Sequence, residues 1–256
     1  MFKPIFLCDL DDTLFQTQRK ITEYGYSAAF KTAAIDQTGK ARSFMTKTQY
    51  NWINWLLTST QLIPITARGT EEISRVQISF QDWKITTHGA VILDKNNQPD
   101  IVWREHIELE LAKYQDILKQ KQALLEQRIE SSGIDAWVRM NTEYDKLNIY
   151  LVAKHRDSKK IEELYQLCNQ IDKETGLEGF YVHRNSNNIA WLPNCIEKGH
   201  ATRFLLSKLR ELQPDTPVLG LGDSVSDHTF LKQCDWFGMP SHGQLFEVFN
   251  STIKHN

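Results

Sequence analysis

Short apolar segments that end near Asp, Thr or Gly recur along this chain, and they limit its fold more than any other feature. They cover residues 5–10, 62–65, 84–87, 218–221 and 236–239. Segments with helical apolar spacing lie among them, at 47–57, 70–80 and 198–212. Short apolar strands that are bounded by turn residues and separated by helices are typical of buried parallel sheets. We therefore predict an α/β layer fold.

The middle of the chain has a different pattern. A long polar helix is predicted from 105 to about 131 and a shorter one over 159–171. Alternating apolar and polar residues predict strands at 134–141, 147–154, 178–184 and 188–193. This order indicates an antiparallel sheet with two helices on one face. We predict a second, α+β domain at 97–191, inserted into a first domain that 1–96 and 192–256 form together.

Composition excludes several classes of protein. The 256 residues carry 30 basic and 32 acidic side chains, so a net charge of -2 gives no general attraction to nucleic acid or to an anionic membrane. Apolar stretches stay well short of the roughly 18 residues that a membrane span needs, and the first one is too short for a signal peptide. The four cysteines are far apart. They fit neither a metal spacing nor a dense disulfide framework, so we expect a cytoplasmic protein. From the net charge and the short apolar stretches we expect no nucleic-acid and no membrane partner.

The sequence Asp9-Leu-Asp11-Asp12-Thr13 follows the first predicted strand directly. On an extended chain Asp9 and Asp11 point the same way, toward the crevice where α/β sheets bind ligands. Two close carboxylates repel each other unless a cation lies between them. The pair therefore indicates a Mg²⁺ site, or a nucleophile beside a general acid. The alternative is an acidic turn that caps the next segment.

A second pair of acids follows a later strand, in Gly220-Leu-Gly222-Asp223-Ser-Val-Ser-Asp227. The two glycines permit a close backbone approach, and two acids four residues apart share a face if a helix begins between them. Mg²⁺ prefers such oxygen ligands, together with water and a substrate phosphate. The alternative is an ordinary helix capped by Asp and Ser.

Thr66 and Lys198 each stand where an element begins or ends. Thr66 ends the second strand in Pro64-Ile-Thr66-Ala-Arg68, where a hydroxyl and backbone N–H groups could hold a phosphate. Lys198 opens the helix before the second acid pair and could offset negative charge. Taken singly, a helix cap and a solvated lysine are the simpler interpretations. Taken together with both acid pairs, they favour one shared site at the strand ends.

The order Asp9/Asp11, Thr66, Lys198, Asp223/Asp227 resembles the haloacid dehalogenase (HAD) superfamily, whose four motifs are DxD, Ser/Thr, Lys/Arg and an acidic GDxxxD. The resemblance implies a Rossmann-like parallel-sheet core. The predicted insertion resembles, in topology rather than in motif, the type II (C2) cap of the Cof-like and sucrose-phosphatase-like branch. Asp12 departs from the pattern, because Gly is common at that position in this branch.

The resemblance also implies roles for individual residues. Asp9 would be the nucleophile that becomes an aspartyl phosphate, and Asp11 the general acid and base. The implied catalytic set also includes Thr66 and Lys198, which would bind the transferring phosphoryl group. The implied Mg²⁺ ligands are Asp9, the backbone carbonyl of Asp11, Asp223 and Asp227, the last of these either as a ligand or as support.

Strand alternation divides the faces of the predicted insertion. The apolar set that should pack on the two helices is Ile134, Ala136, Val138, Met140, Leu147, Ile149, Leu151 and Ala153. The opposite face carries Asp135, Trp137, Arg139, Asn141, Asn148, Tyr150 and Lys154. Aromatic planes beside Arg and Asn suit a polyhydroxylated ligand, although a solvated sheet face would look the same. The candidate substrate-binding residues are Arg68, Trp137, Arg139, Asn141, Asn148, Tyr150 and His183, with Arg184 and Asn187 as weaker candidates.

We therefore expect a Mg²⁺-dependent phosphatase of a small phosphorylated metabolite, preferably a sugar phosphate. A phosphomutase or phosphotransferase would share this core. A receiver-like phospho-aspartate signalling domain is shorter and has no inserted cap, and a nucleotide-sugar transferase that uses DxD for metal would not explain Thr66 and Lys198. A non-catalytic metabolite-binding scaffold would need an incomplete site. The oligomeric state and the role of residues 16–45, which contain Tyr24, Tyr26 and Phe30, are left open.

Overall fold

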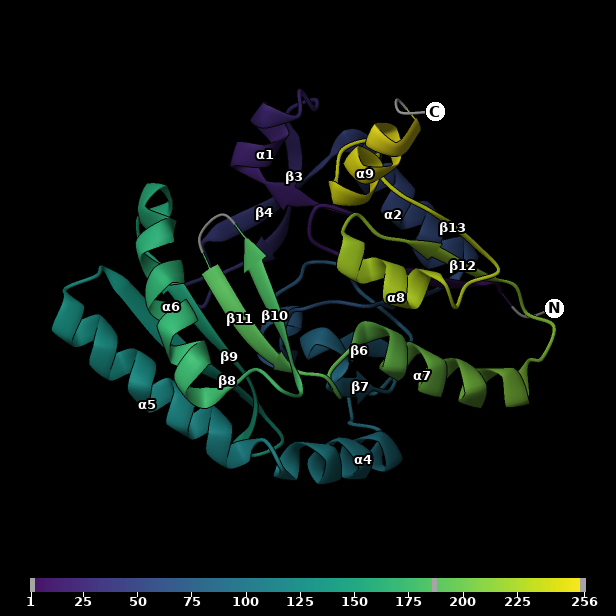
Figure 1. Ribbon diagram of the computed structural model, residues 1–256. Coiled ribbons are helices and arrows are strands. Elements are labelled where there is room, and N and C mark those ends of the chain that lie inside the picture. The colour runs from purple at the N-terminus through teal and green to yellow at the C-terminus, as the bar shows by residue number, and fades with distance from the viewer. Residues whose placement is uncertain (1–2, 186–187, 254–256) are drawn as a thin grey trace. The chain divides into compact units, whose positions relative to one another are not determined.

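The computed structural model describes residues 3–185 and 188–253. The chain divides into two compact units, one formed by Met1–Arg104 with Glu197–Asn256 and the other by Glu105–Ile196 (Figure 1). Both limits of the second unit lie C-terminal to the expected 97 and 191. The upstream limit differs because Asp100 and Trp103 are tied to the first unit. Lys208 Nζ lies 2.5 Å from Asp100 Oδ2, and Trp103 Nε1 donates to the carbonyl of Gly89 at 3.0 Å.

The first unit is built on a parallel sheet in the order β13-β12-β1-β5, which confirms the predicted α/β class. Its strands are β1 (Ile5–Cys8), β5 (Gln61–Pro64), β12 (Val218–Leu221) and β13 (Trp236–Gly238). The main helices of this unit are α2 (Lys47–Ser59), α7 (Lys198–Leu212) and α9 (Gln244–Ile253), and the shorter ones are α3 (Thr70–Ser74) and α8 (His228–Leu231). A capping box of Thr46 with Gln49 fixes the start of α2.

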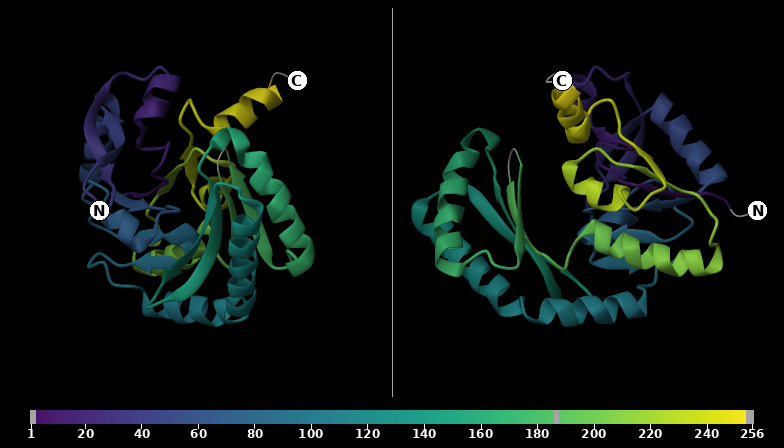
Figure 2. Two further views of the ribbon diagram at one scale, coloured as in Figure 1. Left: turned by 90° about the vertical axis from the view of Figure 1, so that its left-hand side faces the viewer. Right: turned by 45° about the vertical axis from the view of Figure 1, so that its right-hand side comes forward.

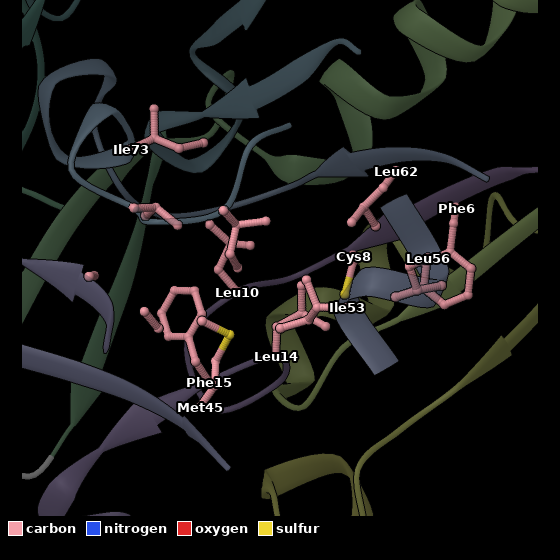
Figure 3. Packing of buried hydrophobic residues seen from close by; sticks show 14 residues of the cluster. Phe6, Cys8, Leu10, Leu14, Phe15, Met45, Ile53, Leu56, Leu62 and Ile73 are labelled. Atoms are coloured by element: carbon pink, nitrogen blue, oxygen red, sulfur yellow. The ribbon is translucent and has the colours of Figure 1, made fainter. Parts of the chain in front are cut away.

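The core of this unit lies against β1, whose four residues are all buried. Phe6 and Cys8 are in one cluster with Ile53 and Leu56 of α2 and Leu62 of β5 (Figure 3). The alternate residues of β1 are also buried. Because both faces of the strand are covered, its sequence is apolar throughout, and the first polar side chain follows where the strand ends.

One predicted strand of this unit is confirmed in part, and one predicted helix is wrong. Segment 84–87 was expected in the parallel sheet, and Ile85 forms an isolated parallel bridge with Ile65, just after β5. The strand β6 (Lys84–Thr86) also pairs antiparallel with β7 (Val91–Leu93). The chain reverses between them through the 3-10 turn Thr87–Gly89, whose residues all have positive φ. The helix expected over 70–80 ends at Ser74. After a turn at Arg75, Val76 forms an antiparallel bridge with Ala34 of β3, and Gln77 N donates to Ala33 O at 2.7 Å.

Residues 16–45 add a small antiparallel sheet to the first unit. Its elements are β2 (Gln16–Thr17), α1 (Gln18–Glu23), β3 (Ala29–Ile35) and β4 (Ala41–Thr46), with strand order β2-β4-β3. Thr17 caps α1, since its side chain accepts from the backbone of Lys20. This segment joins the DxD loop to α2.

The second unit has an antiparallel sheet in the order β10-β11-β9-β8, as predicted. Its elements are α4 (Ile101–Ala112, which begins in the first unit), α5 (Gln115–Ser132), β8 (Ala136–Glu143), β9 (Leu147–His155), the 3-10 turn Ser158–Lys160, α6 (Ile161–Thr175), β10 (Phe180–Asn185) and β11 (Asn188–Pro193). Helices α5 and α6 lie side by side on one face (Figure 2). Leu151, Ala153 and Trp191 of the sheet are buried in their shared cluster with Leu125 and Leu164 of the helices.

The single helix predicted from 105 to 131 is two helices, α4 and α5. The break falls at Tyr114, whose ring packs edge-on against Phe180 with the ring centres 5.2 Å apart. The side-chain amide of Gln115 donates to the carbonyls of Leu111 and Asn148. These contacts replace a continuous helical ladder at this point. Among the described residues there is no helix both long enough and apolar enough to cross a membrane.

Candidate active site

The polar residues of the four motifs meet at one edge of the parallel sheet. Strands β5 and β12 flank β1 in parallel, so their carboxyl ends lie together. Asp9 follows β1, Thr66 follows β5 and Asp223 follows β12, and the backbone N–H of Asp9 donates to Leu221 O at 3.0 Å. Lys198 is the first residue of α7. Ligands bind at this edge of open α/β sheets.

Lys198 is buried between two carboxylates. Its Nζ donates to Asp9 Oδ1 and to Asp227 Oδ1, both at 2.6 Å. The three side chains are at most 9% exposed. Burial alone would lower the pKa of the ammonium group, but the two carboxylates outweigh it and raise the pKa of Lys198. Lys198 is therefore charged at neutral pH.

Asp227 holds the loop that carries Asp223. Its second oxygen, Oδ2, accepts from the backbone N–H groups of Asp223 and Ser224, at 3.2 and 2.9 Å, and from the hydroxyl of Ser224 at 2.7 Å. Burial would raise the pKa of Asp227, but Lys198 and Ser224 together lower it. Gly222 is required here, because a Cβ at that position would lie 2.7 Å from the Cβ of Asp227. Asp227 therefore orients both the loop and the lysine.

Thr13 is a site residue that the sequence analysis missed. Its hydroxyl lies 3.3 Å from Asp9 Oδ2 and 3.0 Å from Asp223 Oδ1, so it links the two motifs. The side chain is buried. Thr13 is present in the motif Asp9-Leu-Asp11-Asp12-Thr13 and could have been considered. The direction of its side chain depends on the turn at Asp12, however, and the spacing of the motif does not reveal that turn.

Three carboxylates of this edge form a set that suits a metal ion. Asp9, Asp223 and Asp227 each offer an oxygen within 4.8 Å of the others. Burial raises the pKa of Asp9 well above its ordinary value despite Lys198, and Asp227 and Asp223 add to the effect. Burial and the nearby carboxylates of Asp227 and Asp12 raise the pKa of Asp223 to about 7. A divalent cation would relieve this repulsion, and an all-oxygen donor set fits Mg²⁺.

Asp11 and Arg68 form a bidentate ion pair, with Arg68 Nε and Nη2 2.7 and 2.8 Å from the two carboxylate oxygens. The side chain of Asp11 is 48% exposed, in contrast to buried Asp9. Thr66 is buried, and its hydroxyl oxygen accepts from the backbone N–H of Arg68 at 3.1 Å. Asp11, Thr66 and Arg68 therefore belong to one connected group at this edge of the sheet.

The other candidate residues lie in the second unit. Strand register places Trp137, Arg139 and Asn141 of β8 on the sheet face away from α5 and α6, together with Asn148, Tyr150 and Lys154 of β9 and His183 of β10. The Arg139 guanidinium lies 6.0 Å from the ring centre of Trp137. Arg184 points to the opposite side, where it donates to Asn169 of α6 at 2.6 Å. Asn187 lies outside the described residues.

No family model matches the sequence, and no curated protein matches it either. Solved structures do match. A trehalose-6-phosphate phosphatase related protein is 16% identical with a TM-score of 0.53, over 94% of this chain and 87% of that one. The sucrose-phosphatase of Synechocystis, in complex with sucrose and phosphate, is 16% identical with a TM-score of 0.53, over 98% and 88%. The C-terminal domain of the trehalose-6-phosphate phosphatase of C. albicans is 16% identical with a TM-score of 0.54, over 90% and 73%. These likenesses show the HAD fold that the four motifs indicated.

Proposed function

We propose that this protein is a Mg²⁺-dependent phosphomonoester hydrolase that acts on a small phosphorylated metabolite, with sugar phosphates as the preferred class. The observation that carries the proposal is the buried carboxylate of Asp9, held between Lys198 and Thr13 at the ligand-binding edge of the sheet. The ammonium group of Lys198 orients this carboxylate and favours its charged form, against the burial that raises the pKa of Asp9. The HAD fold supports the same assignment.

In the proposed reaction Asp9 attacks the phosphorus, and the bond from phosphorus to the leaving oxygen breaks. Asp11 gives that oxygen a proton, then takes one from the water that hydrolyses the aspartyl phosphate. The side chain of Asp11 is half-exposed, so a substrate or a water molecule can reach it, and Arg68 fixes its orientation. Thr66 and Lys198 would bind the transferring phosphoryl oxygens.

Asp9, the backbone carbonyl of Asp11 and Asp223 are the proposed Mg²⁺ ligands. When bound, Mg²⁺ supplies positive charge for the phosphoryl oxygens and separates the repelling carboxylates. We assign Asp227 a supporting role, because its Oδ2 accepts three hydrogen bonds from Asp223 and Ser224 of its own loop while its Oδ1 accepts from Lys198.

The sugar preference rests on the second unit, which we propose is the substrate-specificity cap. Trp137, Arg139, Asn141 and Tyr150 share one face of its sheet and combine aromatic surface with hydrogen-bonding groups. The similar structures include a sucrose-phosphatase in complex with sucrose and phosphate, which supports the same class. The four cysteines are free thiols, which supports a reducing compartment such as the cytoplasm.

The test is phosphate release from a panel of sugar phosphates and other phosphorylated metabolites, with Mg²⁺ and with a chelator. We expect release only with Mg²⁺, and its loss by a factor of about 10³ or more in Asp9→Asn. Asp215→Asn, which changes an exposed acid of the same unit, is the matched control and should keep full activity. Undiminished release in Asp9→Asn would overturn the nucleophile assignment. Transfer of phosphate between sugar positions without net release would indicate a mutase instead.

A further inference from the structure

Asp12 brings an additional acid to the site, at a position where the backbone is unusual. Its φ is 65°, in the left-handed region that Gly adopts freely and Asp tolerates better than most residues. Its backbone N–H donates to Phe15 O at 2.7 Å and so closes a turn over residues 12–15. This turn contains Thr13, whose hydroxyl contacts Asp9 and Asp223. The turn itself would therefore accept Gly, and the carboxylate needs a separate explanation.

The carboxylate of Asp12 forms an ion pair with Lys20 Nζ of α1. Both side chains are about three-quarters buried, at 23% and 26% exposed, so solvent screens the pair only in part. The neighbourhood is acidic, since the charge of Asp12 acts on Asp223 and that of Asp223 acts on Lys20. Lys20 is thus the second lysine that pairs with an acid of this edge, after Lys198.

A lone carboxylate at position 12 would repel the phosphate group of a substrate and attract a cation. The positive charge of Lys20 offsets the negative charge of Asp12 at the site, and the backbone turn at Asp12 is kept. We propose that Lys20 is a positioning residue that neutralises Asp12 and so sets the balance between phosphate and Mg²⁺ binding at this edge. The inference rests on the proposed function, because it concerns the anion and the cation that the function requires.

Three variants separate the charge effect from damage to the structure. Lys20→Met leaves Asp12 unpaired, so phosphate should bind about tenfold more weakly and Mg²⁺ should bind several-fold more tightly. Asp12→Gly leaves Lys20 unpaired, and both shifts should reverse in sign. The double variant Asp12→Gly/Lys20→Met should return both affinities to within about twofold of the wild type. A change that merely loosened the loop would weaken both ligands together.

Arg19→Met is the matched control, because Arg19 is on the same helix and its pair with Glu23 is exposed. It removes the same charge and should leave both affinities unchanged.

The readouts are calorimetric titrations at low ionic strength, first with MgCl₂ and then with inorganic phosphate on the Mg²⁺-loaded protein. The inhibition constant of phosphate in the hydrolysis assay, compared with kcat, gives a second measure. Opposite shifts in Lys20→Met that the double variant restores support the proposal. Weak phosphate binding in both Lys20→Met and the double variant would mean that Lys20 contacts phosphate directly. Unchanged affinities in Lys20→Met would mean that the Asp12–Lys20 ion pair has no effect on the site. Either result overturns the proposal. Wild-type protein that binds both ions without hydrolysing any substrate would contradict the proposed function and leave these binding results valid.

Discussion

Replacing Lys198 by Met tests the electrostatic design of the site. The substitution keeps a side chain of similar length in α7 but removes the ammonium group that joins Asp9 to Asp227. Because the two carboxylates are at most 9% exposed, water cannot replace the lost partner. Removing one member of a buried ion pair costs about 3–5 kcal/mol. At about 2–4 °C per kcal/mol for a chain of this size, the Tm in chelator should fall by about 6–20 °C.

Mg²⁺ should recover part of this loss in the variant. A ligand at 100 times its Kd stabilises the folded state by about 2.7 kcal/mol. In the variant the lost ammonium group leaves more uncompensated carboxylate charge, which the cation can offset. The assay is thermal unfolding with chelator and with Mg²⁺, together with phosphate release, which should fall by about 10²–10³. Arg203→Met, on an exposed face of the same helix, is the control. A Tm of Lys198→Met within about 2 °C of the wild type in chelator would refute the reasoning.

Three further predictions concern stability. Burial lowers the pKa of His183 from 6.5, so stability that is present above pH 6.5 is lost as the pH falls below it. The Tm of His183→Asn should thus fall less than that of the wild type between pH 7 and 5, and equal slopes would contradict this. In the second unit, Lys121 Nζ lies 2.8 Å from buried Asp172 Oδ1. Lys121→Met should cost about 3–5 kcal/mol in urea unfolding, and Lys121→Met/Asp172→Leu should recover most of it; a double variant no more stable than the single one would count against a charge effect. Gly89 has φ +101°, and a Cβ there would lie 2.5 Å from Glu197 O, at the start of α7. Gly89→Ala should therefore lower both Tm and phosphate release, and a wild-type Tm would show that the turn can adapt.

The parts of the site that sequence predicted are those fixed by local rules. Asp9, Thr66 and Asp223 could be placed because each follows a short apolar strand, and parallel strands bring such ends together. Lys198 could be placed because the apolar spacing of α7 marks its first residue. Thr13 could not, because its contact with two acids depends on a left-handed turn at Asp12.

The errors in the fold arise from long-range contacts that local patterns do not contain. Ile73, Val76 and Phe80 have helical spacing, but the backbone beyond Ser74 pairs with β3 instead, and that partner lies about 40 residues away in sequence. The predicted long helix breaks near Tyr114 because Gln115 binds the backbone of Asn148. In both places tertiary hydrogen bonds outweigh local helix propensity.

Identifying the atom that carries the phosphoryl group tests the central claim most directly. The Mg²⁺-loaded protein is mixed with radiolabelled acetyl phosphate, quenched in acid within milliseconds and digested, and the labelled peptide is mapped by mass spectrometry. We predict that the label lies on Asp9, is released by mild base as expected of an acyl phosphate, and is absent from Asp9→Asn. Label on another residue, or wild-type turnover of acetyl phosphate by Asp9→Asn, would contradict the account.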